Sequence, residues 1–81
     1  MNIKTKTPPV TSRRIIVKIE RRLMSDLHSL VEEVDHIAIV RTLDPDLGIV
    51  ELIATEDTYE RALMLAEYFK SSMGAEILSR G

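Results

Sequence analysis

Apolar positions in the first half of the chain follow two spacings, and each spacing predicts a different kind of element. Residues 13–19 are short and rich in β-branched side chains, with alternate residues on one face, which predicts a strand. Residues 21–34 repeat apolar side chains at the spacing of a single helical stripe, which predicts a helix. The stripe consists of Leu23, Leu27, Leu30, Val31 and Val34.

A hairpin is predicted next. Residues 37–43 and 49–54 are both apolar and β-branched, as strands usually are. The segment between them, residues 44–48, contains a proline, two aspartates and a terminal glycine, which supply the chemistry of a tight turn. If Leu43 and Ile49 face each other in this hairpin, Arg41 lies opposite Glu51, an oppositely charged pair across the strands.

The last third of the chain predicts a second helix and a fourth strand. The helix is expected to begin at Asp57, which stands three residues before Glu60 as in a capping box. It is expected to end at Gly74, since glycine is common just past a helix C-terminus. Residues 75–79 form a short apolar segment that predicts the final strand. The buried stripe of this helix consists of Ala62, Leu63, Ala66, Phe69 and Met73.

The order strand, helix, strand, strand, helix, strand predicts an α+β domain of the ferredoxin-like βαββαβ type. In this arrangement both helices pack on one face of an antiparallel sheet, and the first and third strands are central. The domain is expected to span residues 13–81, after a flexible tail at 1–12 that contains two prolines. A strand followed by an amphipathic helix also opens a ribbon-helix-helix dimer. That fold needs a second helix where residues 37–43 predict a strand.

The sheet face away from the helices is unusually apolar for a face in contact with water. Contiguous apolar surface of this kind usually marks an interface. We therefore expect a second chain to cover this face, and a symmetric homodimer is the simplest arrangement. The alternative is that the face assignment is shifted by one residue, which would turn the isoleucines toward the helices. The interface candidates are Ile16, Ile37, Ile39 and Ile53.

Composition limits the number of domains and the kinds of site that the chain can form, and it indicates a cellular compartment. The chain has 81 residues and no cysteine, so it has room for one domain and cannot form disulfides or thiolate metal sites. No apolar run approaches the roughly 20 residues of a membrane helix, and residues 1–12 lack the apolar core of a secretory signal. These features predict a cytoplasmic protein.

Charge is distributed unevenly along the chain. Residues 1–22 hold seven of the eleven basic side chains but one of the thirteen acidic ones. Such a basic arm attracts nucleic acid or an anionic ligand, or else it pairs with the acidic remainder of the molecule. The net charge of −2 disfavours binding to a phosphate backbone. RNA recognition on the sheet is also disfavoured, because the three aromatic residues all lie on the second predicted helix.

No catalytic or metal-binding set is predicted. His28 and His36 are not spaced as metal ligands on one helix face, and no zinc motif accompanies them. The sequence also lacks a glycine-rich phosphate loop and a nucleophile motif, so no cofactor is expected.

One end of the sheet is expected to gather basic groups, Arg21, Arg22 and Arg41, together with Thr42, and these could bind a small anion or carboxylate. The loop after the first strand and the 44–48 turn should meet there. The alternative is a set of salt bridges among Arg21, Arg22, Asp44 and Asp46. The candidate ligand-binding residues are Arg21, Arg22, Arg41, Thr42 and Asp44.

Two resemblances add expectations. The order of elements is similar to that of ACT-type regulatory domains, which implies small-ligand binding between paired domains. This chain lacks the glycine that such domains usually place before the first helix. The hairpin resembles a small uncharacterised bacterial family with an RTLDP element, here Arg41 to Pro45, followed by a second strand at 49–54. That resemblance covers roughly residues 13–70 and implies a prokaryotic cytoplasmic protein of unassigned activity.

Three functions are compatible with these features. The first is a non-catalytic ligand-binding or regulatory module that self-associates through its sheet. The second is an adaptor that binds protein or nucleic acid through its basic N-terminal segment. The third is a small enzyme with a site between subunits, for which Arg41 and Asp44 are the candidates.

Overall fold

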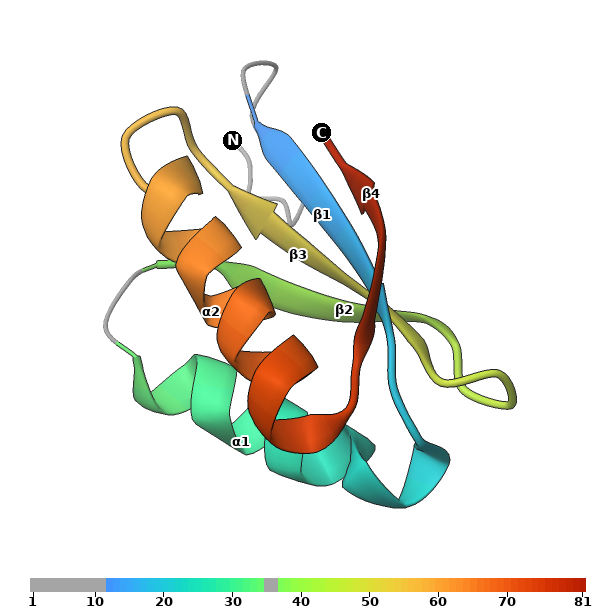
Figure 1. The fold of residues 1–81 in the computed structure, drawn as a ribbon. Helices are drawn as coiled ribbons and strands as arrows, with labels where there is room; N and C mark the ends of the chain where they lie inside the picture. The colour runs from blue at the N-terminus through green and yellow to red at the C-terminus, as the bar shows by residue number, and fades with distance from the viewer. Residues whose placement is uncertain (1–11, 35–36) are drawn as a thin grey trace, which may run out of the picture.

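The computed structural model describes residues 12–34 and 37–81 (Figure 1). The predicted N-terminal tail, residues 1–12, therefore lies outside the described residues except for Ser12. The elements in chain order are β1 (Arg13–Lys18), the short 3-10 helix η1 (Arg21–Leu23), α1 (Met24–Glu33), β2 (Ile39–Asp44), β3 (Ile49–Ala54), α2 (Tyr59–Met73) and β4 (Glu76–Arg80).

The four strands form one antiparallel sheet in the order β2-β3-β1-β4, so β1 and β3 are central and β2 and β4 are edges. Helices α1 and α2 lie on the same side of this sheet (Figure 1). The predicted α+β class, with two helices and a four-stranded antiparallel sheet, is confirmed. The arrangement is compatible with a small ferredoxin-like fold.

The core lies between the sheet and the two helices. Side chains of a strand point alternately to its two faces, and Ile15 and Val17 of β1 are fully buried on the helix side. Phe69 of α2 is also fully buried and is the largest side chain in this core. The remaining buried members are Ile19, Leu27, Val31, Val50, Leu52, Ala54, Ala62, Ala66 and Ala75.

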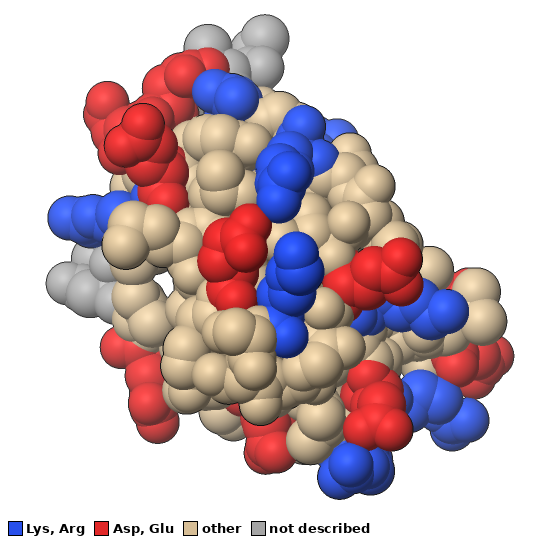
Figure 2. All heavy atoms as spheres, viewed as in Figure 1, with Lys and Arg blue, Asp and Glu red and all other residues tan. Residues whose placement is uncertain are grey.

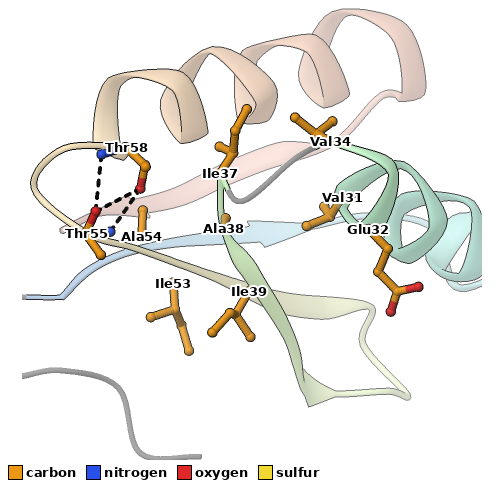
Figure 3. Close-up of a pocket in the computed structure, with 10 residues that line it drawn as sticks. All are labelled: Val31, Glu32, Val34, Ile37, Ala38, Ile39, Ile53, Ala54, Thr55 and Thr58. Carbon is orange, nitrogen blue, oxygen red and sulfur yellow. Dashed lines mark hydrogen bonds between the residues drawn. The ribbon is translucent and has the colours of Figure 1, made fainter.

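The second strand begins two residues later than the sequence predicts. Ile37 precedes β2 and packs against the core instead of pointing away from it. Figure 3 shows its side chain directed toward α2. The prediction that Ile37 shares a face with Ile39 is therefore wrong. The apolar run continues from the connection into the strand, and periodicity alone cannot separate the two.

The second helix also begins later than predicted, at Tyr59 with Thr58 as its N-cap residue. The preceding turn is closed by a reciprocal pair of hydrogen bonds. The Thr55 N–H donates to Thr58 Oγ1 over 3.1 Å, and the Thr58 N–H donates to Thr55 Oγ1 over 3.3 Å. The expectation of a capping box at Asp57 is thus wrong, because the two threonines close the turn.

Candidate interaction surface

The sheet face opposite the helices carries the side chains predicted for it, apart from Ile37. Strand register aligns Ile16 and Arg41 with Glu51, so these three side chains share one face. Ile39 pairs with Ile53, and Figure 3 shows both side chains pointing away from α2. We call this surface the open face. It consists of Arg14, Ile16, Lys18, Ile39, Arg41, Ile49, Glu51 and Ile53.

Exposure varies across the open face. Ile39, on the edge strand, is 65% exposed, and Ile16 and Ile49 are half-buried. Ile53 is 6% exposed, although it does not belong to the core beneath the helices. The expectation that the whole face is open to water is therefore wrong at Glu51 and Ile53. Both lie on the central strand β3, where side chains of β1 and β2 flank them on either side.

The centre of the open face is an acid between two bases. The carboxylate of Glu51 lies 3.5 Å from Nη2 of Arg41 and 3.9 Å from Nε of Arg14. The Glu51 side chain is 6% exposed, whereas the side chains of Arg14 and Arg41 are about half exposed. This trio leaves one excess positive charge on the surface, and the pairing of Arg41 with Glu51 predicted from the sequence is confirmed.

Replacing the buried acid tests whether burial or distance decides the strength of an ion pair. We expect Glu51→Gln to lower the free energy of unfolding by about 1–3 kcal/mol, because two guanidinium groups then face an uncharged buried partner. The matched control is Glu67→Gln. Glu67 is half exposed and lies 2.9 Å from Arg80, so its loss should cost less than about 1 kcal/mol. Urea unfolding at neutral pH measures both, and an equal cost would contradict the prediction.

A hollow of about 450 Å³ lies at the margin of the sheet, where β2 begins and β3 ends (Figure 3). Its wall is mainly apolar, with the two threonines of the turn before α2 and one glutamate at the rim. The lining residues are Val31, Glu32, Val34, Ile37, Ala38, Ile39, Ile53, Ala54, Thr55 and Thr58. Sequence reasoning missed this site. The repeated threonine at Thr55 and Thr58 was the available signal for the closed turn at its rim.

The residues predicted to bind an anion are not brought together as a group. Arg41 and Thr42 lie within β2, on opposite sides of the sheet: Arg41 contacts Glu51, and Thr42 Oγ1 shares a 3.0 Å hydrogen bond with Nε2 of His28 on α1. Arg22 pairs with Glu20 at 3.0 Å. Each of these side chains already has a contact within the chain.

Asp44 has a structural role in the hairpin turn. Its Oδ1 accepts the N–H groups of Asp46 over 3.0 Å and of Leu47 over 3.1 Å. This is the usual way in which an aspartate stabilises a turn. The carboxylate is therefore engaged by the backbone, and the structure places no partner for acid–base chemistry beside it among the described residues.

The loop after β1 and the hairpin turn do meet, as expected. The Ile19 N–H donates to the Gly48 carbonyl over 2.8 Å. A second hollow of about 260 Å³ lies here, with Lys18 and Arg21 at its wall. Glu20 and Glu76 line it as well, so an anion would meet charges of both signs. The geometry does not favour the small-anion prediction.

Part of the basic N-terminal segment, residues 1–22, forms contacts within the chain. Arg13 donates from Nε to the Gly81 carbonyl over 2.6 Å and from Nη1 to Glu56 over 3.1 Å, and its guanidinium lies 3.8 Å from the centre of the Tyr59 ring. Figure 2 shows acidic and basic side chains interspersed over the viewed face, with acids gathered over the turn before α2. This face offers no continuous basic surface to a nucleic acid.

Comparison with known proteins gives no relative: no protein-family model matches the chain, and no curated protein matches its sequence. Within residues 12–34 and 37–81, neither helix has the length and hydrophobicity needed to cross a membrane. In the same described part of the chain, no three His, Asp or Glu side chains are close enough to hold a metal ion.

Proposed function

We propose that this protein is a non-catalytic interaction module, of the ferredoxin-like type, that self-associates through the open face of its sheet. The observation that carries the proposal is the exposed Ile39 beside the half-buried Ile16 and Ile49, on a face that no described element covers. Apolar surface of this kind is stabilised by contact with another chain. A second copy is the simplest partner, because it needs no other component.

The size of the face sets the expected strength of the contact. Strands of six residues are about 20 Å long, and strands lie about 4.8 Å apart, so the sheet presents roughly 400 Å² of flat surface. A standard stable interface buries about 800 Å² on each partner. We therefore expect a dissociation constant in the micromolar range rather than the nanomolar range.

The test places a charge at the centre of the open face. Ile16→Lys sets an ammonium group beside Glu51 across the strands, where the folded monomer accommodates it. In an association through this face, the same group would be buried against the second copy. We expect the apparent mass in sedimentation velocity to rise with protein concentration for the wild type. For Ile16→Lys, we expect the same rise to require a protein concentration at least about tenfold higher.

The matched control is Met64→Lys. Met64 is 69% exposed on α2, similar to Ile39, but it lies on the opposite side of the sheet. This variant should associate as the wild type does. A wild type that stays monomeric at several hundred micromolar, roughly a hundred times the expected constant, would end the proposal. So would an equal effect of the two lysine substitutions.

A further inference from the structure

Some backbone N–H and C=O groups of β2 point into the sheet and others point outward from its edge. The strand registers determine which residues do which. In an antiparallel ladder, a residue directs both its N–H and its C=O to the same neighbour, and successive residues alternate. The bond from Ile19 to Gly48 sets this alternation for β1 and β3, and the bond from Gly81 to Arg14 agrees with it. The odd-numbered residues of β3 therefore bond to β2.

This alternation assigns each residue of β2. Ile39 and Arg41 pair with the odd-numbered residues Ile53 and Glu51, so their backbone groups point into the sheet. The N–H and C=O groups of Val40 and Thr42 then point outward. No described strand pairs with β2 on that side. These are unpaired donors and acceptors on an edge, which is the template for adding another strand.

The two edges of the sheet differ in how much apolar surface they expose. Both edge strands carry a β-bulge, β4 against β1 between Ile16 and Val17 and β2 against β3 between Thr42 and Asp44. On β4, Arg80 is also tied to Glu67 of α2, and a charged side chain on an edge discourages pairing. One large apolar side chain of β4, Leu78, is exposed, whereas along β2 and the following turn three are exposed. These are Ile39, Leu43 and Leu47.

The β2 edge is also self-complementary about Val40. Leu43, which is 42% exposed and lies at a bulge, stands three residues after Val40. Ile37 stands three residues before it and lines the apolar hollow with Val34 and Ala38 (Figure 3). Consider a second copy of β2 that runs antiparallel along this edge, with Val40 opposite Val40. Leu43 of each copy then lies opposite Ile37 of the other, beside its hollow.

We propose that a second copy of this chain pairs antiparallel with β2, about a two-fold axis at Val40, to continue the sheet across both subunits. In this register Ile39 of each copy lies opposite Arg41 of the other, while Arg41 keeps its contact with Glu51. An axis at Arg41 would set two guanidinium groups opposite each other, which is unfavourable. The charge pattern and the position of the hollow thus select the same register.

This edge contact goes beyond the proposed function and does not depend on it. Its axis is perpendicular to the sheet, whereas two sheets packed face to face are related by an axis between them. The two contacts use different surfaces of the sheet, and they close into a tetramer where the two perpendicular axes intersect. Each can therefore be removed without removing the other.

Amide hydrogen exchange tests the edge contact at single residues. In the monomer the Val40 and Thr42 N–H groups face solvent, and in the paired edge they donate to the second copy. We expect their exchange to slow at least about tenfold between roughly 20 μM and 1 mM protein. The Arg41 N–H is the internal control, because it points into the sheet and is protected at both concentrations.

A proline supplies the matching variant. Thr42→Pro removes an outward N–H and leaves the inward bonds of Arg41 intact, which edge strands tolerate. Thr42→Ala keeps the N–H and loses the same hydroxyl group. We expect the proline variant alone to lose the concentration-dependent protection at Val40. Circular dichroism checks that Thr42→Pro folds. If it does not fold, amide exchange of the wild type at the two concentrations still tests the edge contact.

The two proposals fail separately. Fast exchange at Val40 and Thr42 in samples that sedimentation shows to be associated would overturn the edge contact and leave the open face standing. Protection at these amides in Ile16→Lys that equals the wild type, with no loss of mass, would support the edge and end the open face. A monomer at every concentration would overturn both.

Discussion

Gly48→Ala is expected to leave the chain marginally stable or unfolded at room temperature. Gly48 ends the hairpin turn with φ +74°, a left-handed conformation that costs an alanine about 1–2 kcal/mol. A β-carbon there would also overlap the carbonyl oxygen of Ile19. The obstacle is backbone rather than a flexible side chain, so the turn must move and the 2.8 Å bond from Ile19 to Gly48 is lost. We expect a total cost of about 4 kcal/mol or more.

The control is Gly74→Ala, since Gly74 has nearly the same backbone angle, φ +70°. It lies at the end of α2, and a β-carbon there meets no atom within 4 Å. Only the conformational cost remains, so we expect a loss of about 1–2 kcal/mol and a melting temperature roughly 5–15 °C lower. Thermal and urea unfolding compare the two. Equal losses would show that the approach of the Ile19 backbone to the turn does not matter.

Phe69→Ala is the second substitution with a large expected effect. Phe69 is the largest fully buried side chain and packs between α2 and the sheet. Truncation of a buried phenylalanine typically costs about 3–5 kcal/mol, because the lost apolar contact leaves a cavity that neighbours fill only in part. A domain of this length has a total stability of about 4–12 kcal/mol, so this variant should be marginal or unfolded in urea titration.

The neighbouring residue is the control for this prediction. Tyr68 is 49% exposed, and its ring meets the Phe69 ring edge-on at a centroid distance of 6.0 Å. We expect Tyr68→Ala to cost below about 1 kcal/mol, because about half of its surface is already in water. If the two alanine variants lose similar stability, the placement of α2 on the sheet is wrong.

These predictions depend on features that differ in how far the sequence could anticipate them. Alternation along the strands placed Ile16, Ile39 and Ile53 on the face away from the helices, because successive side chains point to opposite faces and the other face packs beneath the helices. The burial of Glu51 did not follow from alternation. It results from the central position of β3, which brings Arg14 and Arg41 from two different strands around one carboxylate.

The candidate anion site shows a second limit. Sequence reasoning placed Arg41 and Thr42 near the end of the hairpin, as part of one basic group. In the structure, their adjacent side chains leave β2 on opposite faces, toward Glu51 and His28 respectively. Neighbouring residues of a strand cannot serve one site on the same face, so the strand assignment itself argued against this group.

The order of elements and the class of fold were readable from the spacing of apolar side chains, because local periodicity reports which face of an element is buried. The hairpin turn was readable from its glycine, proline and aspartates, since those residues have strong local preferences. The sequence did not reveal three other features: the start of β2, the hollow beside Ile37, and the outward N–H groups of Val40 and Thr42. They depend on the register between strands that are distant in the chain, and that register is set only when the sheet packs against its helices.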